Sequence, residues 1–269
     1  MFDALCICQE RRHLYSIICF QALAEEQIER FRQHLYCPEC HGRAYYRKAS
    51  RDGRSACFGS RYHTEGCSLA QSSPGQELEQ RDAAEVAQML TEEVIPFSFN
   101  PGKQGERSRA TTVGAAREGL RPARAGTPRP LTLAKALHSL MRGSDLADSD
   151  TLIELDQGYR FKASNLFVNF ADARAAESAK EARPKMFWGT LSHADGDLDW
   201  LNPAECTDVG IPIRRHRRTI LTRYGIEDRE ALAGAGIMLF GKCYWNQART
   251  RKIIEPWNAE RIHLSLADA

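Results

Sequence analysis

The spacing of cysteine and histidine in residues 36–67, "YCPECHGRAYYRKASRDGRSACFGSRYHTEGC", constrains the fold of this chain more than any other feature. Cys37 and Cys40 are separated by two residues, a spacing at which a tight turn presents two thiolates to one metal ion. His63 and Cys67 form a second pair, separated by three residues. The pairs together make a Cys3His set typical of tetrahedral Zn2+, so we expect one structural zinc ion held by these four side chains.

The sequence between the two pairs predicts how they come together. Two β-rich runs flank Asp52-Gly53, a dipeptide that favours a hairpin turn, and a β-hairpin would bring the pairs side by side. Two residues are alternatives to His63 as the fourth ligand: His41, next to the first pair, and Cys57, on the second predicted strand. A redox role for the Cys-Pro-Glu-Cys motif is disfavoured, because no thioredoxin-like βαβ pattern surrounds it.

Composition divides the chain into two predicted domains and a linker. Residues 1–95 would form a zinc-binding domain with flanking helices, the second of them the acidic "QELEQRDAAEVAQMLTEEV". Residues 96–130 hold five Pro, five Gly and six Arg without an apolar period, which is the composition of a linker. Residues 131–269 would form a β-rich domain.

The pattern within residues 131–269 predicts short strands around one basic helix. The segment "LTLAKALHSLMRGS" predicts a helix that begins after Thr132 and ends at Gly143. "KMFWGTLSHADGDLDWLNP" predicts a hairpin, and "RRHRRTILTRYGI" a helix that precedes three further strands. Such an order fits a small Greek-key barrel, of which an OB-like barrel is one form, or a compact α+β domain. The predicted fold class is therefore α+β: a small zinc-ribbon-like N-terminal domain and a β-rich, OB-like C-terminal domain.

Charge is segregated along the chain although the net charge is only +2. Residues 71–95 carry a net charge of −5, whereas residues 96–135 carry +6. Basic segments interleaved with aromatic residues predict contact with a nucleic acid, DNA in preference to RNA. In the zinc hairpin the candidate contacts are Arg43, Tyr45, Arg47, Lys48, Arg51, Arg54 and Arg61. In the C-terminal region they are Arg214, Arg215, Arg217, Arg218, Lys242, Trp245, Arg249, Arg251 and Lys252.

Catalytic motifs are missing from the sequence. There is no P-loop, no Gly-x-Ser-x-Gly elbow and no His-Glu-x-x-His motif. A restriction-type nuclease needs an acidic residue followed by Asp/Glu-x-Lys to hold Mg2+. Glu154, Asp156 and Lys162 have these residue types but not this spacing. The acidic "SHADGDLD" is typical of a charged hairpin turn rather than of a metal loop.

Location follows from hydropathy and cysteine content. No apolar run approaches the roughly 20 residues that span a bilayer. The start, "MFDALCICQERRHLY", lacks the cationic region that precedes the apolar stretch of a signal peptide. We therefore expect a cytoplasmic protein without a membrane partner, whose cysteines stay reduced.

The segments "LYCPECHGRAYYRK" and "ACFGSRYHTEGC" resemble the N-terminal zinc-binding module of the competence protein CoiA and its relatives. The resemblance covers about residues 1–70 and implies that Phe58 is the aromatic centre of the module. It departs from the family at Cys57, where a histidine is common. It also implies the ligands Cys37, Cys40, His63 and Cys67. A nuclease-like domain follows the module in CoiA-type proteins, which would imply DNA processing.

Taken together, these features predict a nucleic-acid-binding zinc protein without a catalytic site of its own. It would belong to a bacterial mobile-element, competence or antiphage-defence system. One such role is a DNA-sensing subunit of a larger effector complex, such as a type IV CRISPR complex, whose other subunits would then be partners. Two alternatives are a metal-dependent DNA endonuclease of the CoiA type and a protein-interaction adaptor in which zinc stabilises a docking surface.

Overall fold

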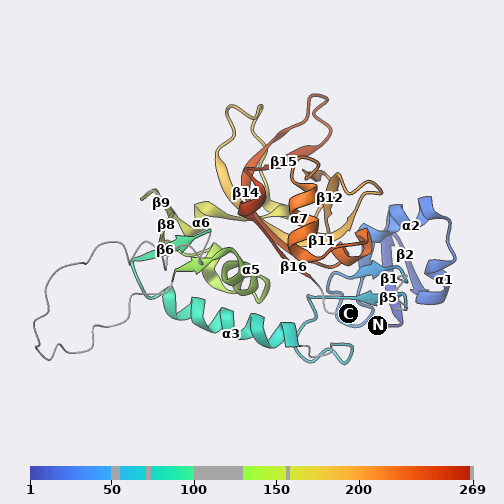
Figure 1. Cartoon of the computed structure of the whole chain (residues 1–269). Coiled ribbons are helices and arrows are strands. Elements are labelled where there is room, and N and C mark those ends of the chain that lie inside the picture. Colours follow the sequence, from blue (N-terminus) through green and yellow to red (C-terminus); the bar gives the residue numbers. More distant parts are fainter. Residues whose placement is uncertain (50–54, 71–73, 100–129, 156–157, 267–269) are drawn as a thin grey trace, which may run out of the picture.

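The computed structural model describes residues 1–49, 55–70, 74–99, 130–155 and 158–266. Within these ranges the chain has a mixed α/β fold that contains a closed, barrel-like sheet. Figure 1 shows an N-terminal module (residues 1–70) in blue, a smaller sheet with two helices beside it, and the barrel in yellow to red. Every helix within the described ranges is too short or too polar to span a lipid bilayer.

The N-terminal module consists of a small sheet, two short helices and a second hairpin around one aromatic core. Its elements are β1 (Asp3–Cys8), β2 (Arg11–Ser16), α1 (Ile17–Gln21), α2 (Glu25–Phe31), η1 (Arg32–His34), β3 (Leu35–Tyr36), β4 (Tyr45–Arg47) and β5 (Cys57–Gly59). The first sheet has the order β2-β1-β3, and β4 pairs with β5 as the predicted hairpin, whose turn lies outside the described residues. Phe20, Tyr46 and Phe58 are buried against one another, with ring centroids 4.9–5.9 Å apart. These three rings hold the helices on the second hairpin.

The second region is a mixed sheet with two helices packed against each other. Its elements are α3 (Pro74–Met89), β6 (Val94–Ser98), β7 (Leu131–Thr132), α5 (Leu133–Met141), η3 (Asp145–Ala147), β8 (Leu152–Glu154) and β9 (Arg160–Lys162). Thr132 caps α5 by accepting a hydrogen bond from the amide of Lys135 at 3.3 Å, and Gly143 follows α5 with φ +72°, as predicted. Asp82 of α3 binds His138 of α5 at 2.7 Å.

The boundary predicted at residue 96 lies inside β6. β6 pairs in parallel with both β7 and β8, which come from the other side of the predicted linker. Val86 of α3 belongs to the same buried cluster as Leu137 of α5. Residues on both sides of the linker therefore share one core, and the division into domains stays a prediction.

The barrel is a ring of strands closed by the long strand β11. Its region comprises α6 (Ala163–Leu166), β10 (Phe167–Asn169), η4 (Phe170–Asp172), β11 (Pro184–Ala194), β12 (Trp200–Pro203), β13 (Val209–Pro212), α7 (Arg217–Tyr224), η5 (Arg229–Leu232), β14 (Gly236–Trp245), β15 (Lys252–Pro256), η6 (Ala259–Arg261) and β16 (Ile262–Ser265). The first half of β11 pairs with β14 and its second half with β12. The ring then runs β12-β13-β15-β14, with β13 and β15 parallel and the other pairs antiparallel. The predicted hairpin β11–β12 and the predicted basic helix α7 are thus both present.

The N-terminal module packs directly against the barrel. Arg32 of η1 forms a buried ion pair with Glu230 of η5 at 2.9 Å. The ring of Tyr45 lies over Gly234, whose backbone φ is +75°; a Cβ atom at this position would approach the ring to 2.2 Å. Arg61 donates a hydrogen bond to the carbonyl oxygen of Ser265 at the end of β16, at 2.8 Å. Module and barrel are joined by polar and aromatic contacts from several segments.

Candidate metal centre and nucleic-acid interface

The first ligand pair lies in the tight turn that follows β3. The amide of Cys37 donates to the carbonyl of Gly42 at 2.7 Å, and the amide of His41 donates to the carbonyl of Cys37 at 3.1 Å. These hydrogen bonds fold the turn so that Cys40 returns to the same side as Cys37. Gly42 leaves room for the second ligand loop, because a Cβ there would lie 2.0 Å from the carbonyl oxygen of Tyr62.

The second ligand pair lies in the loop after β5, and an exposed carboxylate joins it to the first. Gly66 has φ +84°, a left-handed conformation that favours glycine, just before Cys67. Glu39, between the first two ligands in sequence, accepts hydrogen bonds from the amide and the hydroxyl of Ser68 at 2.8 and 2.5 Å. These bonds lower the pKa of Glu39 below its ordinary value. Both turns are therefore held in place by contacts outside the ligands.

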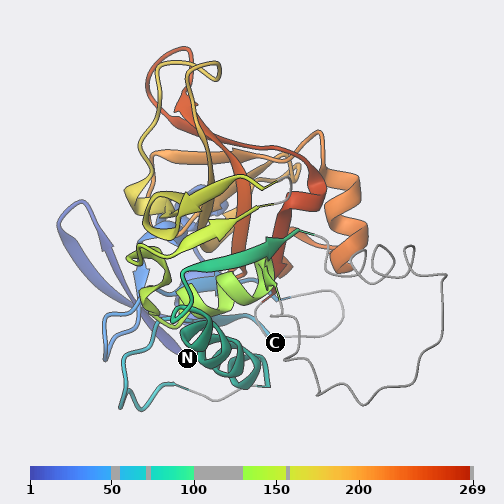
Figure 2. The same cartoon turned by 90° about the vertical axis from the view of Figure 1, so that its left-hand side faces the viewer.

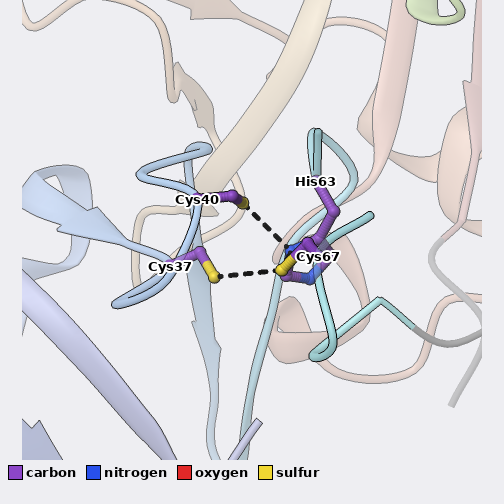
Figure 3. A group of neighbouring side chains, drawn as sticks. All are labelled: Cys37, Cys40, His63 and Cys67. Carbon is purple, nitrogen blue, oxygen red and sulfur yellow. Dashed lines mark hydrogen bonds between the residues drawn. The ribbon is translucent and has the colours of Figure 1, made fainter. Parts of the chain in front are cut away.

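Four side chains converge between these turns. The ligand atoms of Cys37, Cys40, His63 and Cys67 all lie within 4.8 Å of one another (Figure 3). The sulfurs of Cys37 and Cys67 are 3.8 Å apart, and Nδ1 of His63 lies 3.4 Å from Cys40 and 3.3 Å from Cys67. Tetrahedral Zn2+ with its usual bond lengths gives S···S distances of roughly 3.8 Å and S···N distances of roughly 3.6 Å. The arrangement can hold a metal ion and fits zinc.

The two thiols with shifted pKa values differ in their readiness to bind a metal. Burial raises the pKa of Cys40, but amide hydrogen bonds from Gly42 and Thr64 outweigh it and lower the pKa to about 6. Burial, with further contributions from the neighbouring thiols, raises the pKa of Cys67 to about 11. Metal binding must therefore displace a proton from Cys67, so the affinity for the metal increases as the pH rises.

The other candidate ligands stand outside this group. His41 is exposed, and Cys57 lies on β5 opposite Arg47. Neither residue belongs to the set of four neighbouring ligands. Among the described residues, no other cluster of three or more His, Cys, Asp or Glu side chains is close enough to hold a metal. The nuclease candidates are separately engaged, since Glu154 binds Arg160 at 2.6 Å and Lys162 binds Asp150 at 3.1 Å. Asp156 lies outside the described residues.

The structure places two candidate arginines of the zinc hairpin in structural contacts. The guanidinium of Arg43 lies 4.7 Å from the ring centroid of Tyr36 and donates to the carbonyl of Gln33 at 2.9 Å. Arg61 binds the carboxylate of Glu79 at 2.6 Å. Arg43 therefore joins segments within the module and Arg61 joins the module to α3, so neither side chain projects freely.

The remaining hairpin candidates are divided between interior and surface. Arg47 is buried with its guanidinium 5.8 Å from the ring centroid of Tyr45, which itself packs on the barrel. Lys48 is exposed and pairs with Glu25 at 3.4 Å. Arg51 and Arg54 lie outside the described residues. Within the described part of the hairpin, Lys48 is thus the exposed cation.

A second basic group surrounds the start of α7 and is open to solvent. The side chains of Arg214 and Arg215 are 81% and 86% exposed. Arg217 binds Asp199 at 2.9 Å, and Arg218 is exposed at the first turn of the helix. Arg214 and Arg215 are held only by long ion pairs, to Asp199 at 3.5 Å and to Glu255 at 3.6 Å, and are the cations of this group most available to a ligand.

The candidates on β14, β15 and their connecting loop are more tightly held. Lys242 donates to the carbonyl of Ala179 at 3.1 Å, and Lys252 binds Asp208 at 3.0 Å. Arg249 is exposed at the loop and pairs with Glu177, while Trp245 is half-buried at the end of β14. These contacts fix the loop between β14 and β15 beside the preceding segments of the chain.

Arg251 is a predicted nucleic-acid contact, and the structure surrounds it with residues of distant strands that the sequence did not indicate. It donates hydrogen bonds to the side chain of Asn202 at 2.5 Å and to the carbonyl of Val209 at 3.1 Å. Its guanidinium lies 5.8 Å from the ring centroid of Trp200. Neither Trp200 nor Asn202 stands out in the sequence, and only the closure of the ring brings β12 and the end of the β14–β15 loop together.

Comparison of the chain with protein-family models, with curated proteins and with solved structures found no match. The resemblance of residues 1–70 to the CoiA module therefore stays a prediction. The function has to be inferred from the geometry of the metal centre and of the ring.

Proposed function

We propose that this chain is a nucleic-acid-binding zinc protein whose barrel is OB-like. The observation that carries this proposal is the order of strands around the ring. An OB fold is a five-stranded Greek-key barrel that binds oligonucleotides on the face of its second and third strands, with the loops after the first and fourth strands. Numbered along this chain, the ring strands β11, β12, β13, β14 and β15 pair in the order β11-β12-β13-β15-β14 and back to β11. Helix α7 lies between the third strand and the fourth.

The side chains on the corresponding face suit a polyanion with exposed bases. Trp200 and Arg251 offer an aromatic ring beside a guanidinium, which is the combination that single-strand binding proteins use. Arg214 and Arg215 lie at the start of α7, one connection away from β13. Asp199, in the loop after β11, is already paired with Arg217, so that its charge is compensated.

We further propose that the Cys3His group holds one structural Zn2+. Four protein ligands close the tetrahedral shell and leave no position for a catalytic water. The ion would fix the turn after β3 to the loop after β5, and Tyr62 in this loop donates a hydrogen bond to Glu205 of the barrel region at 3.2 Å. Zinc would thus set the position of the module on the barrel.

The wider role follows from this combination. A CoiA-like module and an OB-like barrel suit a cytoplasmic DNA-binding component of a mobile-element, competence or antiphage system, including a subunit of a CRISPR-type effector. The endonuclease alternative is tested by incubating plasmid DNA with Mg2+ or Mn2+ and the protein or its Glu154→Ala variant. If the protein cuts the plasmid in a metal-dependent reaction and Glu154→Ala does not, the endonuclease function replaces the proposed binding function.

A protein-interaction adaptor is the second candidate function, and exposed apolar side chains favour it. Phe2, Leu14 and Ile18 of the N-terminal module are 59%, 54% and 60% exposed. Large exposed hydrophobic side chains are typical of protein contact sites where they form a continuous patch. An adaptor would bind no oligonucleotide with salt-dependent affinity.

Oligonucleotide binding distinguishes these functions. We expect the zinc-loaded chain to bind oligonucleotides with micromolar affinity or better, and the affinity to fall as salt is raised, because cations on the protein displace counterions from phosphates. Single-stranded and duplex DNA and RNA would be compared by fluorescence anisotropy. The variant Arg214→Ala/Arg215→Ala should weaken binding, whereas Arg160→Ala/Lys162→Ala, which removes two exposed cations from β9, should not. Equal binding by both variants would contradict the proposed face.

A further inference from the structure

A cleft of about 720 Å³ opens between the β1–β2 hairpin and the end of α2. It shares no residue with the metal centre or with the ring. Figure 2 shows the β1–β2 hairpin, in the darkest blue, projecting from the rest of the molecule. The side chains in the wall that matter here are Arg11, Arg12, His13, Tyr15, Arg30 and Phe31. Its volume falls within the roughly 300–1,000 Å³ of ligand-binding clefts.

The wall of the cleft is cationic and carries no compensating carboxylate. None of its lining residues is Asp or Glu; Glu10, at the tip of the hairpin, is not part of the wall. Arg11 and Arg12 are exposed and make no ion pair with any residue that the structure describes. Burial raises the pKa of Cys6, another wall residue, to about 11, so its thiol adds no negative charge. The charge of the wall calls for an anionic occupant.

Aromatic rings lie among these cations. Successive side chains of a strand alternate between its faces, so β2 presents Arg11, His13 and Tyr15 on one face. The ring of Tyr15 lies 4.3 Å from that of His13 and 6.0 Å from that of Phe31. Such rings beside guanidinium groups bind unpaired bases as well as phosphates, whereas a duplex keeps its bases stacked inside.

Arg30 is already oriented toward the cleft. Its guanidinium donates a hydrogen bond to the side-chain oxygen of Gln9 at 2.6 Å and lies 5.9 Å from the ring centroid of Phe31. A planar guanidinium held in this way is suited to phosphate, which it can bind through two parallel hydrogen bonds. Less side-chain freedom remains to be lost when a ligand binds.

Helix α2 borders both the cleft and the barrel. Glu29 of α2 lies 3.4 Å from His193 of β11, and its charge is compensated by Arg32 and Arg229 at 3.0 and 3.1 Å. The next residue, Arg30, lines the cleft. A nucleic acid bound on the barrel therefore has a second cationic surface close by, on the other side of one helix.

We propose that this cleft binds a single-stranded segment of nucleic acid, with phosphates on Arg11 and Arg30 and a base against the rings of Tyr15 and Phe31. The inference rests on the proposed function, to which it adds a second contact separate from the barrel. An acidic peptide is the competing occupant, and it would use the cations but not the rings.

The experiment compares three double variants of the full-length, zinc-loaded chain. Arg11→Ala/Arg30→Ala changes the cleft, Arg214→Ala/Arg215→Ala changes the barrel, and Arg160→Ala/Lys162→Ala is the matched control. Affinity for a labelled oligo-dT strand and for a duplex is measured over a salt series. A plot of log affinity against log salt has a negative slope. In the cleft variant this slope should be shallower by about 1.4, since each phosphate contact on a single strand contributes roughly 0.7. Single-strand affinity near 100 mM salt should fall about 10-fold or more.

The outcomes separate the cleft from the proposed function. Wild-type affinity in the cleft variant, with weakened binding in the barrel variant, would overturn the cleft proposal and leave the function standing. No binding by the unmodified chain would overturn both. A larger loss for duplex than for single strand, or displacement of oligo-dT by poly-glutamate at equal charge, would overturn the single-strand assignment.

Cross-linking gives a reading that does not depend on substitutions. Ultraviolet irradiation of the complex with an oligonucleotide that carries 5-bromouracil should attach it to a peptide that contains Tyr15 or Phe31. Cross-links confined to peptides of the barrel would overturn the proposal. Zinc content and circular dichroism of each variant would check that the fold is retained.

Discussion

The buried ion pair between Arg32 and Glu230 is predicted to decide whether the N-terminal module stays on the barrel. The two side chains are 2% and 7% exposed and meet at 2.9 Å, although they are 198 residues apart. Replacing Glu230 with alanine leaves a guanidinium in a site that water does not reach. Removing one partner of a buried pair costs about 3–5 kcal/mol.

The contacts around this pair refine that magnitude. Glu29 still binds Arg32 at 3.0 Å after the substitution, which favours the lower end of the range, about 3 kcal/mol. In the unmodified chain the amide of Lys48 donates a hydrogen bond to Glu230 at 3.2 Å. Loss of this acceptor adds about 1 kcal/mol to the destabilisation. We therefore expect Glu230→Ala to lower the free energy of unfolding by about 4 kcal/mol. At about 2–4 °C per kcal/mol for a chain of this size class, the melting temperature falls by about 8–16 °C.

Urea unfolding at fixed, saturating zinc measures this loss, because metal that binds the folded state alters the apparent stability. The matched control is Glu177→Ala, which breaks the exposed pair with Arg249, whose side chains are 59% and 70% exposed. It should change the free energy by no more than about 0.5 kcal/mol. The reasoning is refuted if Glu230→Ala loses less than about 1 kcal/mol. The double variant Arg32→Met/Glu230→Leu leaves neither charge of the pair buried. The reasoning is also refuted if its loss of unfolding free energy equals the sum of the losses in Arg32→Met and Glu230→Leu.

Three further predictions concern the metal, a close approach and pH. Mass spectrometry should find one zinc per chain, and Cys40→Ser should lose it, because a three-ligand site no longer closes the tetrahedral shell. Gly234→Ala should destabilise the fold by about 2–4 kcal/mol in urea unfolding, since the new methyl group meets the ring of Tyr45 at 2.2 Å and the backbone φ is +75°. The pKa of His193 is lowered to about 3 by burial and then by neighbouring guanidinium groups, whereas an unfolded histidine titrates near pH 6.5. Only the unfolded state binds the proton between these values, so stability falls as pH drops below about 6.5, and His193→Gln should flatten this dependence between pH 7 and 5.

The zinc and glycine measurements each have a control in the same chain. Cys57→Ser, outside the group of four, should retain zinc. Gly225→Ala, at φ +61° with no atom within 4 Å of the new methyl group, should lose only the conformational part, about 1 kcal/mol. Zinc retained by Cys40→Ser, equal losses at the two glycines, or an unaltered slope in His193→Gln would each contradict its prediction.

Features set by neighbouring residues were predictable from the sequence. The ligand pairs are fixed by the two- and three-residue spacings that a metal ion demands, and they converge as expected. Helix α5 begins and ends at its signals, Thr132 and Gly143, and α7 ends at Gly225, which adopts φ +61°. The coarse α/β character follows from such local patterns.

Features set by distant contacts were not predictable. The β1–β2 hairpin turns at Gln9 and Glu10, which have φ +50° and +64°. Such turns usually contain glycine or asparagine, and because neither is present the sequence carries no signal of this hairpin. The parallel pairing of β13 with β15 depends on ring closure, which no local pattern encodes. Arginines also look alike in sequence whether they face solvent or not: Arg61 binds Glu79 within the fold, whereas Arg215 is exposed.

The contacts between module and barrel impose an order of events during synthesis. Arg61 binds Ser265, which is 204 residues further along the chain, and Arg32 binds a residue 198 further. Chains are synthesised at about 5–20 residues per second, so the four candidate metal ligands emerge about 10–40 seconds before Ser265 does. During this interval the metal can be captured while the surface that will dock on the barrel is still open. The nascent chain therefore passes through a period in which the module has no complete barrel to pack against. This period ends only when β16 has been made and Ser265 can meet Arg61.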